Sequence, residues 1–120
     1  RAVVLESNTL LKVFMDAGFS LYMYGTTGID SFQQHYEDAA KEIPARVQTI
    51  KLLLRDSPNQ KESLERIEMV GNRATKLLAQ GSKLLMDSSS LKRSGTEREA
   101  MERIIAELAG ELRAFVKDQE

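Results

Sequence analysis

The side chains that could carry out chemistry in this sequence are few in kind. Its 120 residues include one histidine, His35, three tyrosines and no cysteine. Without cysteine there is no disulfide, thiolate metal site or thiol nucleophile, and a single histidine makes a histidine-based metal site or catalytic triad hard to build. Enzymatic chemistry would have to rest on carboxylates, lysine, tyrosine or serine. We therefore expect a binding or interaction module with no catalytic residues.

Two groups of carboxylates have spacings that place them along one helix. They are Glu62, Glu65 and Glu68, and Glu99, Glu102 and Glu107. Helical bundles that hold two metal ions use inward-facing Glu together with Glu-x-x-His pairs. The residue three positions before His35 is Phe32, so that pair is missing here. Because the acidic residues stand among Lys and Arg, we interpret them as solvated surface and predict no metal and no cofactor.

Phosphate and nucleic-acid chemistry also lack a signature. The segment Gly25-Thr26-Thr27-Gly28 has too few glycines for a phosphate-binding loop and no Lys after it, so we interpret it as a plain turn. Lys and Arg number 17 against 18 Asp and Glu, which gives a net charge of −1. This balance argues against a nucleic-acid partner.

Aromatic residues gather around that turn. Six of the seven fall between residues 14 and 36, namely Phe14, Phe19, Tyr22, Tyr24, Phe32 and Tyr36. Core packing explains them in one interpretation. In the other, tyrosine hydroxyls and His35 meet an apolar patch in a small pocket beside the turn. The second interpretation makes Tyr22, Tyr24, His35 and Tyr36 candidate ligand-facing residues.

The elements that would position these residues follow from apolar periodicity. Steps of three and four predict four helices, at about residues 2–25, 29–55, 58–87 and 96–119. The first carries two adjacent apolar rows, one through Val3, Leu10, Phe14, Ala17, Leu21 and Tyr24 and one through Val4, Leu11, Met15 and Tyr22. The second follows a single row, Ile29, Phe32, Tyr36, Ala40, Ile43, Val47, Ile50 and Leu54, in which Pro44 predicts a kink near residues 40–43. The third includes Gly71, Ala74 and Gly81, which would let a neighbouring helix approach closely.

Short connections make neighbouring helices antiparallel, so we predict an all-α fold: an up-down-up-down four-helix bundle with both termini at one pole. Residues 1–120 form one domain at this length. Charge favours the third and fourth helices lying side by side, because residues 57–95 carry seven basic and four acidic side chains and residues 96–120 carry four and seven. The apolar pattern starts at Val3 and continues to Val116. We therefore expect a fragment of a longer protein whose outer helices continue.

Two stretches point to a known family. Residues 16–36, DAGFSLYMYGTTGIDSFQQHY, and residues 52–68, LLLRDSPNQKESLERIE, resemble the third class of CHASE-type sensor domains. The positions that match the family's motif are Asp16, Tyr22, Phe32, Tyr36, Asp56, Pro58 and Gln60. The resemblance runs from about residue 9 to the end of the chain.

The resemblance implies a function. Such domains lie outside the cytoplasmic membrane between two transmembrane helices, and the attached cytoplasmic part is most often a histidine kinase. Cyclases for cyclic dinucleotides and chemotaxis receptors also occur. It therefore implies a non-catalytic, extracytoplasmic (periplasmic) signal-input domain of an inner-membrane receptor, which passes its stimulus on by helix displacement. Its partners would be its own transmembrane helices, a cytoplasmic output domain and a second copy in a homodimer.

Two other functions remain open at this point. One is a cytosolic helical adapter or scaffold module whose exposed stripe binds a partner helix. The other is an enzyme that uses carboxylates inside a helical bundle.

Overall fold

The computed structural model describes residues 2–55, 60–86 and 95–119, with side chains for all of these except 60, 84–86, 95–98, 100, 101 and 104. Helices make up 97% of the described residues, and no strand occurs among them. The four helices are α1 (Ala2–Thr27), α2 (Asp30–Leu54), α3 (Gln60–Met86) and α4 (Gly95–Gln119). The predicted all-α fold is confirmed.

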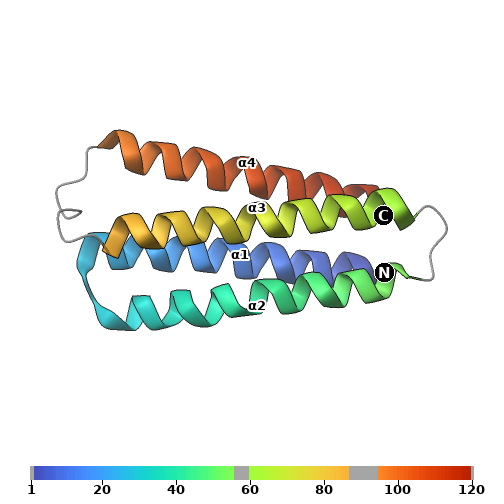
Figure 1. Cartoon of the computed structure of the whole chain (residues 1–120), viewed down its shortest axis with the longest axis horizontal. Coiled ribbons are helices and arrows are strands. Elements are labelled where there is room, and N and C mark those ends of the chain that lie inside the picture. Colours follow the sequence, from blue (N-terminus) through green and yellow to red (C-terminus); the bar gives the residue numbers. More distant parts are fainter. Residues whose placement is uncertain (1, 56–59, 87–94, 120) are drawn as a thin grey trace.

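The helices run alternately up and down in an elongated bundle of 50 × 25 × 17 Å (Figure 1). The start of α1 and the end of α4 lie at the same end of the bundle, which we call the terminal pole. The turn between α1 and α2 lies at the opposite end, the distal pole. The predicted four-helix bundle is therefore confirmed.

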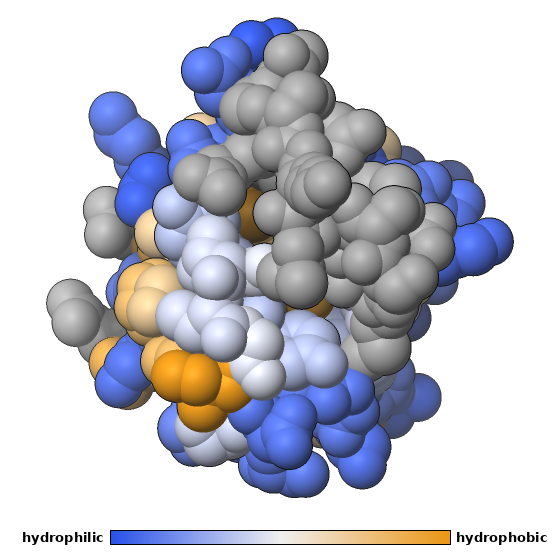
Figure 2. All heavy atoms as spheres, turned by 90° about the vertical axis from the view of Figure 1, so that its left-hand side faces the viewer, coloured by the Kyte–Doolittle hydropathy of each residue, from blue (hydrophilic) through white to orange (hydrophobic). Residues whose placement is uncertain are grey.

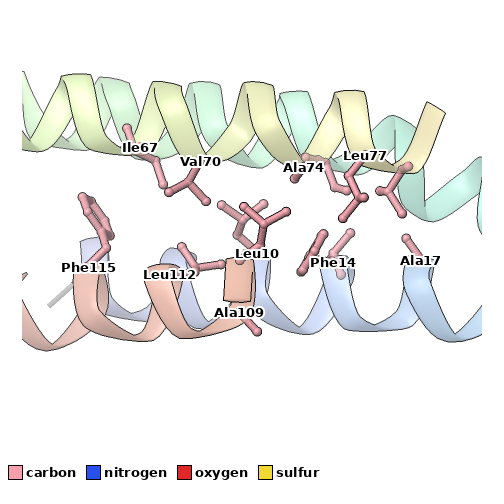
Figure 3. Close-up of a cluster of buried hydrophobic side chains, with 14 of the residues drawn as sticks. Leu10, Phe14, Ala17, Ile67, Val70, Ala74, Leu77, Ala109, Leu112 and Phe115 are labelled. Atoms are coloured by element: carbon pink, nitrogen blue, oxygen red, sulfur yellow. The ribbon is translucent and has the colours of Figure 1, made fainter. Parts of the chain in front are cut away.

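A continuous apolar core holds the four helices together. Side chains of α1, α3 and α4 point toward one another in its interior (Figure 3), and α1 also touches α3 across the bundle. Neighbouring α3 and α4 are in contact, as their opposite charges favour. The side chains that are almost fully enclosed are Leu21, Ile43, Ile50, Leu54, Ile67, Leu108 and Phe115.

The burial pattern confirms most of the predicted faces and corrects one. On α2, Tyr36, Ile43, Ile50 and Leu54 are buried as the apolar row predicts. On α1, the row through Leu10, Phe14 and Leu21 is buried, whereas in the other row Val4 and Leu11 are partly buried and Met15 and Tyr22 are exposed. Ala17 is buried as the first row predicts, and the core side of α1 is completed by three small residues outside both rows, the buried Ser7, Gly18 and Ser20. Because small side chains carry a weak hydropathy signal, periodicity alone did not place them.

Small residues bring the helices close together at two places. A Cβ atom at Gly71 of α3 would stand 2.9 Å from a γ carbon of Val47 on α2. One at Gly18 of α1 would stand 3.1 Å from the δ carbon of Ile105 on α4. At Gly71 a Cβ would force Val47 to shift, whereas at Gly18 the end of the Ile105 side chain would have to move by a few tenths of an ångström, so both glycines allow close approach of the helices.

The turn at the distal pole differs from the prediction. Helix α1 continues through Gly25 to Thr27, and the turn is made by Gly28 and Ile29. The Thr27 hydroxyl donates to the Met23 carbonyl at 2.6 Å and thus extends the helix by satisfying its last turn. Gly28 then adopts φ +69°, a left-handed conformation that favours glycine after a helix. Helix α2 is continuous through Pro44.

Candidate functional site

The distal pole carries the aromatic residues that the sequence singles out. Tyr22 and Tyr24 lie on the last turns of α1, and Phe32, His35 and Tyr36 lie on the first turns of α2. Figure 2 looks onto this pole and shows hydrophobic surface beside weakly polar surface. The pole is therefore an amphipathic surface.

The four candidate ligand-facing residues do not converge on one point. Tyr22 is exposed, Tyr24 is partly buried, His35 is exposed and Tyr36 is buried. Residues one or two positions apart on a helix do not share a face, which separates Tyr22 from Tyr24 and His35 from Tyr36. Their ligand-facing role stays a prediction.

Tyr36 is held in the core by its hydroxyl. The side chain is 8% exposed, and the hydroxyl donates a hydrogen bond to the Leu78 carbonyl oxygen on α3 at 3.0 Å. Burial raises the pKa of this phenol, and a hydrogen bond with Ser82 opposes the rise. Tyr36 thus ties α2 to α3 near the distal pole.

The family-motif positions are scattered over the bundle. Asp16 is exposed on α1, and Phe32 is partly buried on the same face of α2 as Tyr36, four residues later. Gln60 starts α3, while Asp56 and Pro58 lie outside the described residues. The motif therefore marks helix faces and ends.

The carboxylate groups lie on the outside of the bundle. Glu62, Glu65 and Glu68 are exposed on α3, and Glu99, Glu102 and Glu107 are exposed on α4. Within the described part of the chain, no three side chains of the metal-binding types come together. A cavity at the centre of the bundle, lined by residues such as Leu10, Ile43 and Leu112, has a volume of only about 10 Å³. That is about the space of a single water molecule.

Ion pairs join the helices in two hairpins, a feature that sequence reasoning did not find. On one side, Glu6 of α1 pairs with Arg46 of α2 at 3.2 Å. On the other, Arg66 of α3 pairs with Asp118 of α4, and the Arg66 guanidinium lies 5.5 Å from the centre of the Phe115 ring. The opposite charges of α3 and α4 pointed to this pairing but could not identify its members.

The α3–α4 pairing continues toward the middle of the bundle. Arg73 of α3 pairs with Glu111 of α4 and, at 3.9 Å, with Glu107. Gln119 also donates to the Ser63 hydroxyl at 3.1 Å. Each exposed pair contributes only about 0–1 kcal/mol, but the series keeps the end of α4 attached to α3.

Contacts between the two hairpins are apolar on the α1–α4 side and partly polar on the α2–α3 side. Helices α1 and α4 meet through small and apolar residues, with Gly18 against Ile105. About three turns earlier on α1, the Ser7 hydroxyl is fully buried and has no hydrogen-bond partner among the described residues. Besides the bond from Tyr36, α2 and α3 share the half-exposed pair Lys51–Glu68 at 3.6 Å.

Comparison with known proteins gives one match. The family model described as CHASE3 domain matches residues 1–119, almost the whole chain. This is a family of extracellular sensor domains of signalling proteins. No curated protein and no solved structure matches the chain significantly. None of the helices, over their described residues, is long and apolar enough to cross a membrane.

Proposed function

Because the chain belongs to the CHASE3 domain family, we propose that it is the extracytoplasmic, periplasmic signal-input domain of an inner-membrane receptor whose cytoplasmic part is a histidine kinase. A cyclic-dinucleotide cyclase is the second candidate output. The domain itself is sensory and non-catalytic. Its partners in this proposal are its own transmembrane helices and the output domain.

The observation that carries the mechanism is the division into two hairpins. Polar contacts hold α1 to α2 through Glu6–Arg46 and α4 to α3 through Arg66–Asp118 and Arg73–Glu111. The helices α1 and α4 reach the terminal pole on different hairpins (Figure 1). A relative shift of the hairpins would therefore displace α1 against α4 where both would continue toward the membrane.

The contacts between the hairpins suit such a shift. Small side chains at the α1–α4 contact offer little resistance to sliding, and interhelical packing of this kind allows two discrete arrangements. The bond from Tyr36 to Leu78 holds the hairpins at the distal pole, away from the terminal pole. A stimulus that changes packing at the distal pole would thus act on one of the points where the hairpins are joined, the others being the Lys51–Glu68 pair and the Gly71–Val47 contact.

The energy required is modest. A ligand shifts a two-state equilibrium only by its differential affinity for the two states, and allosteric couplings are typically about 1–3 kcal/mol. Loss of one buried hydrogen bond costs about 0.5–1.5 kcal/mol. Breaking the Tyr36 bond is therefore of the right size to bias the two packings.

Labelling in intact cells tests the location. The chain has no cysteine, so Ala114→Cys, at an exposed position of α4, gives it a single thiol. In the full-length protein we expect a membrane-impermeant maleimide to label this variant in intact cells. The parent protein and a variant with a cysteine in the cytoplasmic part are the controls. Labelling only after lysis would contradict the proposal and favour the cytosolic adapter.

A further inference from the structure

The outward side of α1 is the one helix surface in the described part of the chain where large apolar residues dominate. Leu5 is 69% exposed, Phe19 61%, Met15 41% and Tyr22 36%. Helix α1 has three charged residues in 26, Glu6, Lys12 and Asp16. Exposed positions of α4, by contrast, are mostly charged, among them Glu102, Arg103, Glu107, Arg113, Lys117 and Asp118.

These exposed residues follow a regular spacing. Together with the exposed Asn8 and Lys12 they form the series Leu5, Asn8, Lys12, Met15, Phe19 and Tyr22, which we call the α1 seam. Its alternating steps of three and four make a seven-residue repeat, the period that keeps a stripe of side chains against a partner helix. The seam is about 26 Å long at 1.5 Å per residue. Core packing within one copy leaves each of these side chains at least one-third exposed.

We propose that the α1 seam pairs with the α1 seam of a second copy of this chain, in a parallel two-fold dimer with both terminal poles on the same side. The parallel direction rests on the proposed function, because two copies anchored in one membrane must present the same pole to it. A stripe with a heptad repeat is complementary to itself when the helices are parallel, since each seam residue then meets its own counterpart.

The polar residues of the seam limit the affinity of this pairing, because Lys12 would face its own counterpart and two ammonium groups repel each other. Asn8 and Lys12 occupy neighbouring seam positions in the half nearer the terminal pole, and the apolar Met15, Phe19 and Tyr22 occupy the half nearer the distal pole. A polar residue at one seam position fixes the register and the number of helices at a cost in stability. The dimer is thus defined in register and weak in affinity.

The exposed area supports a weak dimer. At roughly 200 Å² for a large side chain, the four apolar residues expose about 400 Å² per copy, and a symmetric pair with its polar neighbours buries on the order of 1,000 Å². Interfaces of this size are at the lower limit for stable complexes. Tethering in a membrane raises the effective concentration into the range of about 1 mM, so the same contacts suffice there.

Disulfide trapping of the 120-residue chain tests the pairing. Oxidation of Phe19→Cys or Met15→Cys should give a covalent dimer about tenfold faster than oxidation of Ala45→Cys or Ala114→Cys, because only the seam holds two copies of one residue together. The two control positions are exposed on α2 and α4. Equal rates of covalent dimer formation at the seam and control positions would overturn the proposal.

Mixed variants test the direction. In a parallel pair Asn8→Cys links to Asn8→Cys and Phe19→Cys to Phe19→Cys, whereas an antiparallel pair links Asn8→Cys to Phe19→Cys. A size-tagged copy distinguishes these products on a gel, and predominance of the mixed product would overturn the parallel arrangement.

As a non-covalent check, Phe19→Lys should lower the sedimentation coefficient at high protein concentration without lowering the melting temperature. The isolated chain is used throughout, so a negative result leaves the labelling test of location unaffected.

Discussion

At the scale of the residue, Tyr36 combines burial with a hydrogen bond between the hairpins. Its phenol lies in the core, and its proton is held by the Leu78 carbonyl oxygen. The apolar row on α2 predicted the burial of Tyr36, because residues 32, 36, 40 and 43 share a face. The partner carbonyl could not be predicted, since it depends on how far α3 is shifted along α2.

Tyr36→Phe should lower the free energy of unfolding by about 0.5–1.5 kcal/mol at pH 8, which is the net contribution of one buried hydrogen bond. Because burial raises the pKa of Tyr36, the folded chain keeps this proton at pH values where the unfolded chain, with a phenol pKa of about 10, has lost it. The stabilisation is therefore complete below pH 10 and declines as the pH rises from 10 toward the folded pKa. Urea unfolding at pH 8 and at pH 10.5 measures this stabilisation. The difference in free energy of unfolding between wild type and Tyr36→Phe should be smaller at pH 10.5 than at pH 8. A larger difference at pH 10.5 would contradict the raised pKa of Tyr36.

Ser7 provides a second test at this scale. Its hydroxyl is fully buried without a partner among the described residues, and such a group costs about 1–3 kcal/mol. Ser7→Ala should therefore raise the free energy of unfolding. The control is Ser20→Ala, since Ser20 is slightly exposed and its hydroxyl is not among the buried groups that lack a hydrogen-bond partner. A destabilised Ser7→Ala chain would show that the hydroxyl has a partner in solution.

At the scale of the element, the sequence predicts the helices well and their outward faces less well. Periodicity locates the buried face of α2 because one face of that helix is apolar and the other is largely polar. On α1 apolar residues cover both sides, so periodicity could not distinguish the core row from the α1 seam. Gly25 predicts an end of α1 two residues before the observed one, because glycine is a common helix stop. The hydroxyls of Thr26 and Thr27 continue the helix by bonding to carbonyl oxygens of its previous turn, and these bonds exist only in the folded helix.

Close approach of α2 and α3 can be tested at Gly71. A Cβ there would stand 2.9 Å from Val47, whose branched side chain has little freedom to move. We expect Gly71→Ala to destabilise the chain by about 1–3 kcal/mol through overpacking. The matched control is Gly110→Ala, where a Cβ meets open space and the helix should gain about 0.5–1 kcal/mol. Thermal melting measures both, and adding Val47→Ala to Gly71→Ala should restore part of the loss.

At the scale of the whole molecule, the bundle, its connectivity and the common pole of its two ends could be predicted from helix number and short connections. The candidate site could be predicted only in part. Sequence patterns located the aromatic residues but not their separation over different faces of the distal pole. The hairpin division was not predictable, because ion pairs such as Glu6–Arg46 join residues that are 40 positions apart.

The central claim is that the position of α1 relative to α4 sets the output, and a disulfide between them tests it most directly. Both γ carbons of Ile105 lie 3.8 Å from a Cβ placed on Gly18, so the pair Gly18→Cys and Ile105→Cys lies within the reach of a disulfide. The measurement is the ATP-dependent autophosphorylation expected of the proposed full-length histidine-kinase receptor in membranes, with and without Tyr36→Phe, in oxidised and reduced samples. We predict that Tyr36→Phe changes the output of the reduced receptor, because it removes one bond between the hairpins, and has no effect once the disulfide has fixed α1 to α4. The same effect of Tyr36→Phe in both samples, or no effect in either, would contradict the account.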